Sequence, residues 1–253
     1  MDQIKLHPRI KVVVLGHKGM LGHMVYKVLK QDSNFLVSYI STKFGDRVLL
    51  RGWDKSMFNN IDFVINCIGA IPQKTNKFDI NWELPIWLNN NTRCKIIHPA
   101  TDCESGNDSY SVSKRIATDY IKDYCKKTKI IQTSIIGPEL NSNYSLLEWF
   151  LSQKGEVEGY TKAIWNGVTT LEWAKQCENI INNWDKTPIV TTLYSNKISK
   201  FNLLRIIQDC YNKTDVVVMP KKLGNDKSLS GNIKIKDIRY QLEDLINYEE
   251  NGG

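Results

Sequence analysis

Apolar runs and amphipathic stretches alternate regularly in the first half of the chain. Short runs rich in β-branched residues predict buried parallel strands over 10–15, 35–40, 63–68, 95–98 and 129–133. Apolar positions three and four residues apart predict helices over 23–30, 80–90 and 111–127. This alternation of strand and helix predicts an α/β protein with a doubly wound parallel sheet whose two faces are covered by helices.

The pattern changes after Gly137 and Pro138. Helices are expected over 146–151, 170–183 and 200–211, with single strands over 189–193 and 216–219. We therefore expect residues 1–135 to form the sheet domain and residues 136–253 to form a smaller C-terminal lobe that binds substrate. Some segments of this lobe are expected to return to the sheet, so the two parts are interleaved and their boundary is soft.

The composition is that of an ordinary globular protein. Of 253 residues, 42% are hydrophobic and 24% are charged, which excludes a disordered or fibrous chain. No apolar stretch approaches the ~18 residues of a membrane helix, and the N-terminus lacks the pattern of a signal peptide. The six cysteines form no closely spaced pair, so we expect no metal site, no disulfide framework and a cytoplasmic protein.

The chain carries a net charge of +7, from 34 Lys and Arg against 27 Asp and Glu. These basic residues are scattered and form no nucleic-acid-binding module, so we expect no nucleic-acid partner. A basic surface without a partner explains most of them, and a cleft for a phosphate-bearing small molecule explains the charge equally well.

A glycine motif follows the first predicted strand and opens the first predicted helix. Its glycines are Gly16, Gly19 and Gly22, in the spacing G-x-x-G-x-x-G. Glycine permits a tight turn and a close backbone approach to a pyrophosphate, while the helix N-terminus supplies free N–H groups. The motif favours a dinucleotide-binding Rossmann fold; the alternative is an ordinary glycine-rich turn between a strand and a helix.

The second predicted strand indicates which cofactor is bound. A site for NAD usually carries an acidic residue at this strand end, but the chain continues with Ser41, Thr42 and Lys43. These three side chains, together with Lys18 in the glycine loop, suit a 2′-phosphate and favour NADP(H) over NAD(H). The alternative is that both lysines are solvated and that other groups hold the adenosine.

Tyr110 and Lys114 stand four residues apart on a predicted helix and therefore share one face of it. The lysine ammonium is expected to lower the pKa of the tyrosine from about 10. Thr101, at the end of the preceding predicted strand, supplies a hydroxyl that orients the reacting oxygen. Together these groups predict a proton donor for a carbonyl that receives hydride.

At this point the chain resembles the extended short-chain dehydrogenases and reductases. Among these it is similar to the dTDP-4-dehydrorhamnose reductase group, which acts on nucleotide-linked sugars. The stretches that carry the resemblance are 16–22, 64–70, 100–103, 110–114, 133–137, 165–170 and 198–204. The resemblance implies an NAD(P)-dependent oxidoreductase that reduces the 4-keto group of a nucleotide-linked 6-deoxy sugar, with a nucleotide sugar as its partner molecule and a homodimer as its common assembly.

The same resemblance assigns roles to individual residues. It implies that Tyr110 protonates the substrate, that Lys114 binds the nicotinamide ribose and that Thr101 completes the triad. The pyrophosphate would lie on Gly16, Gly19, Met20, Leu21 and Gly22, and the adenosine and ribose against Cys67, Ile68 and Gly69. Asn166, Gly167, Val168 and Thr169 would face the substrate, and the neighbouring Trp165 offers a ring on which a sugar can stack.

Two alternatives remain open at this stage. Some relatives also epimerise the carbon beside the ketone, with a cysteine at the position of Cys103 as the acid and a base from the second lobe, for which Lys154 is the nearest candidate; the alternative is a plain loop cysteine. The loop between Thr101 and Tyr110 is shorter than in these relatives, which affects the choice of sugar. An alternative of another class is a non-catalytic protein that binds or senses the nucleotide.

Overall fold

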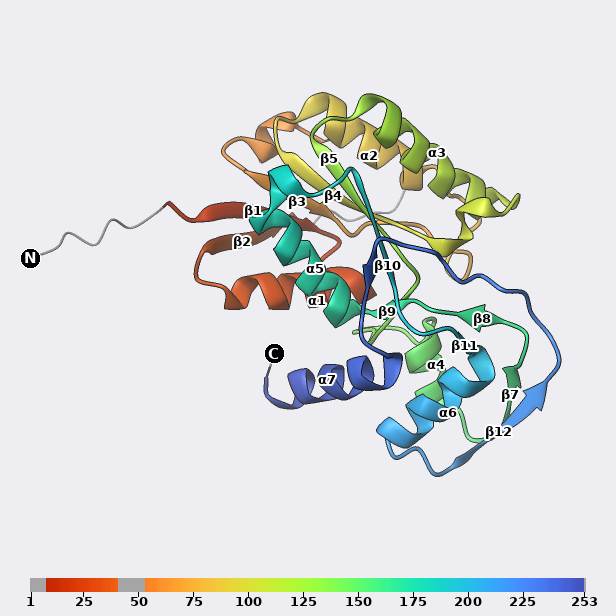
Figure 1. The fold of residues 1–253 in the computed structure, drawn as a ribbon. Coiled ribbons are helices and arrows are strands. Elements are labelled where there is room, and N and C mark those ends of the chain that lie inside the picture. The colour runs from red at the N-terminus through yellow and green to blue at the C-terminus, as the bar shows by residue number, and fades with distance from the viewer. Residues whose placement is uncertain (1–7, 41–52, 253) are drawn as a thin grey trace, which may run out of the picture.

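A seven-stranded parallel sheet forms the centre of the computed structural model, which describes residues 8–40 and 53–252 (Figure 1). In order across the sheet, the strands are β2 (Phe35–Ile40), β1 (Ile10–Leu15), β3 (Phe63–Asn66), β4 (Lys95–Ala100), β5 (Thr128–Gln132), β10 (Val190–Tyr194) and β13 (Ile233–Lys234). The order changes direction at β1, which lies between β2 and β3. In doubly wound sheets, ligands bind at this switch point, outside the carboxyl ends of the strands.

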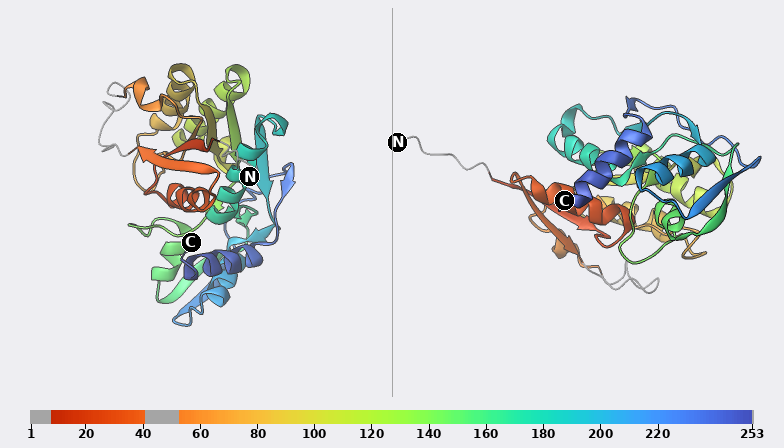
Figure 2. Two further views of the ribbon diagram at one scale, coloured as in Figure 1. Left: turned by 90° about the vertical axis from the view of Figure 1, so that its left-hand side faces the viewer. Right: turned by 90° about the horizontal axis from the view of Figure 1, so that it is seen from below.

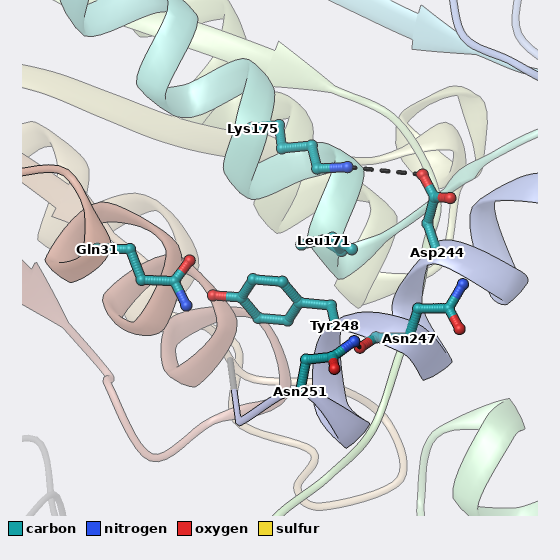
Figure 3. A pocket seen from close by; sticks show the side chains of 7 residues that line it. All are labelled: Gln31, Leu171, Lys175, Asp244, Asn247, Tyr248 and Asn251. Carbon is teal, nitrogen blue, oxygen red and sulfur yellow. Dashed lines mark hydrogen bonds and ion pairs between the residues drawn. The ribbon is translucent and has the colours of Figure 1, made fainter.

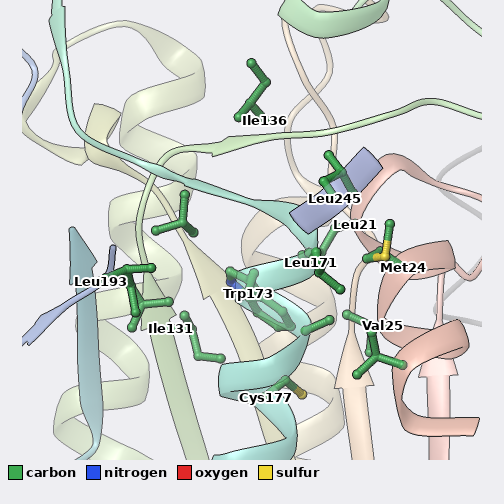
Figure 4. Packing of buried hydrophobic residues seen from close by; sticks show 14 of the residues in the cluster. Leu21, Met24, Val25, Ile131, Ile136, Leu171, Trp173, Cys177, Leu193 and Leu245 are labelled. Carbon is green, nitrogen blue, oxygen red and sulfur yellow. The ribbon is translucent and has the colours of Figure 1, made fainter. Parts of the chain in front are cut away.

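Helices cover both faces of the sheet, as the alternating pattern predicts. Figure 1 shows α2 (Ile80–Asn91) and α3 (Ser109–Tyr124) on one face and α1 (Met20–Gln31) and α5 (Thr170–Asn182) on the other. Leu21, Met24 and Val25 of α1 face Leu171 and Trp173 of α5 across the core (Figure 4). This packing buries the apolar stripe of α1 completely, and it anchors the helix whose N-terminus follows the glycine motif.

The second half of the chain builds a smaller lobe that Figure 2 shows beside the sheet and its helices. Its helices are α4 (Leu146–Ser152), α6 (Lys200–Cys210) and α7 (Ile238–Glu250). Its strands form three two-stranded sheets: β7 (Gly155–Tyr160) with β12 (Val216–Lys221), β8 (Ile164–Trp165) with β11 (Ile198–Ser199), and β6 (Ile135–Ile136) with β9 (Val168–Thr169). Single turns of 3₁₀ helix complete the chain as η1 (Lys55–Phe58), η2 (Asp102–Ser105) and η3 (Trp184–Lys186).

Two parts of the second half return to the sheet domain. Strands β10 and β13 extend the sheet, and α5 packs on its face against α1. The chain therefore crosses between the sheet domain and the lobe several times. The division into two domains at residue 135 remains a prediction. The sequence analysis assigned no element to α7, β7 or the short strands. The buried residues Ile238, Leu242 and Leu245 of α7 do stand at helical spacing, whereas strands of two residues are too short to show a pattern.

Candidate functional site

The glycine motif forms a tight turn between β1 and α1. Gly16 has a φ of 75°, and a Cβ atom on it would lie 2.8 Å from the carbonyl oxygen of Cys67. A Cβ on Gly22 would lie 2.1 Å from the carbonyl oxygen of Gly16. No side chain caps α1 and its first turn holds no acidic residue, so the free N–H groups and positive end of the helix dipole point out of the turn. This cradle fits a pyrophosphate.

The segment after β3 lies against the same turn. The amide of Cys67 donates to the carbonyl of Leu15 at 3.0 Å, and the side chain of Ile68 lies 3.0 Å from the position of a Cβ on Gly16. Gly69 follows on the exposed side. The structure thus brings Cys67, Ile68 and Gly69 beside the glycine turn, at the carboxyl edge of the sheet.

The adenosine end of the predicted cofactor site is only partly described. Ser41, Thr42 and Lys43 lie outside the described residues, and Lys18 is exposed on the glycine turn. The His17 ring stacks on Tyr39 with a centroid separation of 3.7 Å, and Tyr26 meets Tyr39 edge-on at 5.7 Å. Sequence reasoning missed this aromatic group; the available signal was a histidine in the glycine loop and a tyrosine near the end of β2.

Thr101, Tyr110 and Lys114 come together between β4 and α3. Thr101 follows β4 directly and begins η2, while Tyr110 and Lys114 lie one turn apart on α3. The Thr101 hydroxyl donates to Asp102 Oδ1 at 2.9 Å and lies close enough to Tyr110 to lower the pKa of its phenol. The buried Lys114 Nζ donates to the carbonyl of Pro99 at 2.7 Å. The Tyr110 ring packs edge-on against Phe78, with centroids 5.7 Å apart.

The protonation of this group differs from the expectation. Burial, with smaller electrostatic contributions from Cys103 and Asp102, raises the pKa of Tyr110 to about 12, and the nearby Thr101 hydroxyl opposes this effect. Burial also lowers the pKa of Lys114 to about 8. The expected net depression of the tyrosine pKa is therefore wrong for the unliganded protein, because desolvation dominates. The phenol stays protonated at neutral pH, which is the form that a proton donor needs.

A buried amide also supports the site, and the sequence analysis missed it. Asn81 on α2 accepts a hydrogen bond from the Ala70 amide at 2.7 Å, and its own amide donates to Ser113 Oγ at 3.0 Å. Ser113 in turn donates to the carbonyl of Tyr110 at 2.7 Å. This chain of contacts ties the segment after β3 to the turn of α3 that carries Tyr110. Its sequence signal was a lone asparagine at the start of the predicted helix.

A pocket of about 350 Å³ opens beside this group, between the sheet domain and the lobe. The sheet side contributes Asp102 and Cys103, and the lobe contributes apolar side chains and two lysines. The lining residues of the lobe and of the segment that leads to it are Ser134, Ile135, Ile136, Leu146, Ala163, Ile164, Trp165, Lys200, Leu203, Gly224, Asn225 and Lys227. The two lysines on this otherwise apolar wall suit a ligand that carries phosphate.

The lysine that approaches Cys103 is Lys227. Its Nζ donates to Cys103 Sγ at 3.6 Å, so the lobe contacts the η2 turn at this point of the pocket. Lys154 does not approach Cys103. It precedes β7, where its charge helps to lower the pKa of Asp215. The other end of β7 leads to Ala163, which lines the pocket. Six strand residues span roughly 20 Å. The structure therefore corrects the proposed partner of Cys103 from Lys154 to Lys227.

Residues 166–169 do not line the pocket, contrary to the expectation. Asn166 is buried and donates to the Leu229 carbonyl at 2.8 Å while accepting from the Leu229 amide at 2.9 Å. Gly167 packs against the Ser134 backbone, Val168 is fully buried, and Thr169 caps α5. Their role is therefore to build the lobe. Only Trp165 of this stretch lines the pocket, and its Nε1 donates to Ser134 Oγ at 2.8 Å.

A second hollow lies outside this site, where α1, α5 and α7 meet (Figure 3). It has a volume of about 330 Å³ and a largely polar lining that includes the Lys175–Asp244 ion pair. No residue singled out from the sequence lines it. Among residues 8–40 and 53–252, no group of three metal-ligating side chains occurs, and no helix is long and apolar enough to cross a bilayer.

The chain matches known proteins by its fold but not by its sequence. No protein-family model and no curated protein sequence matches the chain. Solved structures do match: a dTDP-4-dehydrorhamnose reductase from Clostridium acetobutylicum has a TM-score of 0.74 at 16% identity, covering 95% of this chain and 100% of its own. The enzyme of that name from Bacillus anthracis, in complex with NADP, has a TM-score of 0.76 at 14% identity, covering 95% and 99%. The chain therefore shares the fold of these two reductases.

A third structure with this fold is a GDP-6-OMe-4-keto-L-xylo-heptose reductase from C. jejuni, with a TM-score of 0.69 at 10% identity, covering 98% of this chain and 99% of its own. The coverage extends through the lobe as well as the sheet, which confirms the predicted fold class over nearly the whole chain. At these identities the likeness concerns the fold, so activity is argued from the site itself.

Proposed function

We propose that this protein reduces the 4-keto group of a nucleotide-linked 6-deoxy sugar, with NADP(H) as its cofactor. The observation that carries the proposal is the group formed by Thr101, Tyr110 and Lys114, which adjoins the pocket that Asp102 and Cys103 line. Bound cofactor supplies a hydride at its nicotinamide ring. The structural neighbours named as nucleotide-sugar reductases support the class of substrate.

The chain's own residues then serve the rest of the reaction. Tyr110 holds its phenol proton at neutral pH and donates it to the carbonyl oxygen as the new alcohol forms. Thr101 lies beside the phenol and orients it. Lys114, a cation below about pH 8, stabilises the phenolate that remains. The free N–H groups at the start of α1 bind the pyrophosphate.

The preference for NADP(H) is part of the proposal. Lys18 is exposed on the glycine turn, within the chain segment that faces the adenosine in this fold, and it offers a cation for a 2′-phosphate. The exposed lysines of the pocket, Lys200 and Lys227, suit the diphosphate of a nucleotide sugar. A homodimer and a cytoplasmic location stay predictions.

The experiment uses purified protein, NADPH and a panel of 4-keto-6-deoxy nucleotide sugars. We expect loss of NADPH absorbance with at least one member of the panel, and a product alcohol at the former carbonyl carbon. Binding of NADPH without oxidation by any ketone would contradict the proposed reaction and favour a protein that senses the nucleotide. Absence of NADPH binding would contradict the cofactor assignment as well.

A second candidate is a bifunctional enzyme that epimerises the carbon beside the ketone before reducing it. The observation that favours it is the contact between two residues that line the pocket: Lys227 Nζ donates to Cys103 Sγ at 3.6 Å. Burial raises the pKa of Cys103, so its thiol is protonated and able to act as an acid. Lys227 can serve as the base on the other face of the ring only when bound substrate separates it from Cys103. One proton leaves the ring carbon and one returns to its other face.

Running the same panel in heavy water separates the two candidates. Oxidation of NADPH without deuterium in the ring identifies a plain ketoreductase. Deuterium on the carbon beside the new hydroxyl identifies epimerisation, and Cys103→Ser and Lys227→Met should then each abolish the exchange. Lys154→Met is the matched control, because Lys154 lies at the other end of β7.

A further inference from the structure

A carboxylate lies buried beneath the proposed catalytic group, and no step of the proposed reaction uses it. Glu104 is 8% exposed and belongs to η2, three residues after Thr101. Burying a carboxylate in a protein interior is unfavourable unless hydrogen bonds or opposite charges compensate. Its partners therefore indicate what the side chain does.

The carboxylate of Glu104 joins the three elements that surround the catalytic group. Its Oε1 accepts from the Thr101 amide at 3.3 Å and from Thr118 Oγ1 at 2.8 Å. Its Oε2 accepts from Gln132 Nε2 at 3.3 Å. Thr101 begins the η2 turn, Thr118 lies one turn beyond Lys114 on α3, and Gln132 ends β5.

A second contact fastens the same turn to α3. Arg115 Nη1 donates to the carbonyl of Glu104 at 2.6 Å and to that of Gly106 at 2.8 Å. The guanidinium thus binds backbone rather than the carboxylate. Among the described residues, no ion pair within 4.0 Å involves the carboxylate of Glu104, so its charge acts on its surroundings at longer range.

Lys114 is the buried cation on which the charge of Glu104 acts. Burial lowers the pKa of Lys114, and the attraction of Glu104 opposes the effect. The other charged and titratable groups around the pair are Tyr110 and Lys122 on α3, Asp102 on η2, and His98 on β4, whose pKa is well below its ordinary value because it is buried beside Lys114. Two carboxylates lie on η2, and Glu104 is the buried one. Burial raises the pKa of Glu104, and the hydrogen bonds from Thr118 and Thr101 oppose that effect.

We propose that Glu104 is a positioning residue of this site: its buried carboxylate fastens Thr101 to α3 at Thr118, one turn beyond Lys114, and acts electrostatically on the Lys114 ammonium. The importance of this role for catalysis rests on the proposed function, but the pKa of Lys114 that tests it can be measured without turnover. A simple helix cap at the same position would need only a side-chain oxygen, which glutamine also has. Glu104→Gln therefore keeps an acceptor for Thr101 and Thr118, while it removes the charge and the bond from Gln132.

The test follows the Lys114 ammonium itself. Carbon-13 and proton NMR of the lysine side-chain ε positions, with the Lys114 signal assigned through Lys114→Arg, gives its pKa in the cofactor-free protein. In Glu104→Gln we expect that pKa to fall by roughly half a unit to one unit. Glu148→Gln, which changes another partly buried carboxylate in α4, is the matched control and should leave Lys114 unchanged.

An unchanged Lys114 pKa in a folded Glu104→Gln protein would overturn the proposal. If that variant does not fold, Glu104→Asp retains the charge but moves it by one methylene, and a smaller fall in the same direction is expected; no fall would again overturn it. Where turnover is measurable, its alkaline limit should move by the same amount as the Lys114 pKa. A Lys114 shift in a protein that reduces no ketone would leave this role intact and reject the proposed function.

Discussion

The two walls of the pocket are built in different ways. On the sheet side, Tyr110, Lys114 and Glu104 sit in a network of hydrogen bonds that joins β4, η2, α3 and β5. On the lobe side, Lys227 stands on an exposed loop that Asn166 holds by two hydrogen bonds to Leu229. A rigid wall suits reacting groups that need fixed geometry, whereas a loop wall adapts readily to different substrates. We expect changes on the first wall to affect turnover and changes on the second to affect substrate binding.

The largest effect is expected at Tyr110. Tyr110→Phe removes the proton donor and should lower kcat about 10³-fold, within the range typical of a general acid. Because the ring and its packing on Phe78 remain, the Kd for NADPH should change less than about twofold. Steady-state kinetics and a fluorescence titration of NADPH measure the two quantities.

The matched control is Tyr124→Phe, on the same helix but 70% exposed, which should leave both quantities unchanged. If Tyr110→Phe kept more than about a tenth of the parent kcat, Tyr110 would not be the proton donor, and the proposed difference between the two walls would be wrong.

The next effect concerns the cofactor cradle. Gly22→Ala places a Cβ 2.1 Å from the Gly16 carbonyl oxygen, which forces the turn apart. Overpacking of this kind costs about 1–3 kcal/mol, so NADPH should bind about 10- to 100-fold more weakly. Gly19→Ala meets the same oxygen at 3.3 Å and should have a much smaller effect. Equal losses in the two variants would indicate that the cradle does not depend on this contact.

The pH dependence of turnover tests the charge on the sheet wall. Lys114 is cationic below its pKa of about 8, so kcat should be highest below that value and fall as the pH rises through it. The fall should approach about tenfold per pH unit if one proton is lost. Tyr110, with its pKa raised to about 12, stays protonated throughout this range and should not contribute. A kcat that rises between pH 7 and 9 has the wrong sign for this assignment.

The smallest effect is expected on the lobe wall. Asn166→Ala removes both hydrogen bonds to Leu229 and should loosen the loop that carries Lys227. We expect the KM for the nucleotide sugar to rise about three- to tenfold, with kcat and the Kd for NADPH nearly unchanged. A loss of kcat with an unchanged KM would show that the lobe wall takes part in turnover.

The sheet wall was largely predictable and the lobe wall was not, for a physical reason. Gly16, Gly22, Tyr110 and Lys114 act through local spacing along one turn or one helix, which a sequence displays directly. Lys227 reaches Cys103 across 124 positions of chain, so no local pattern connects them. The expectation for Asn166 to Thr169 was wrong because their neighbours in β6 and in the loop around Leu229 bury them. Glu104 has a clear role only once Thr118 and Gln132 are seen beside it.

The central claim is tested most directly with NADPH carrying deuterium at the transferable position of its nicotinamide ring. Mass spectrometry and NMR of the sugar product would locate the label after incubation with the 4-keto substrate. We expect one deuterium on the former carbonyl carbon with the parent protein, and formation of the labelled product about 10³-fold more slowly with Tyr110→Phe at equal NADPH occupancy. Labelled product from Tyr110→Phe at the parent rate, or an alcohol without deuterium, would contradict it.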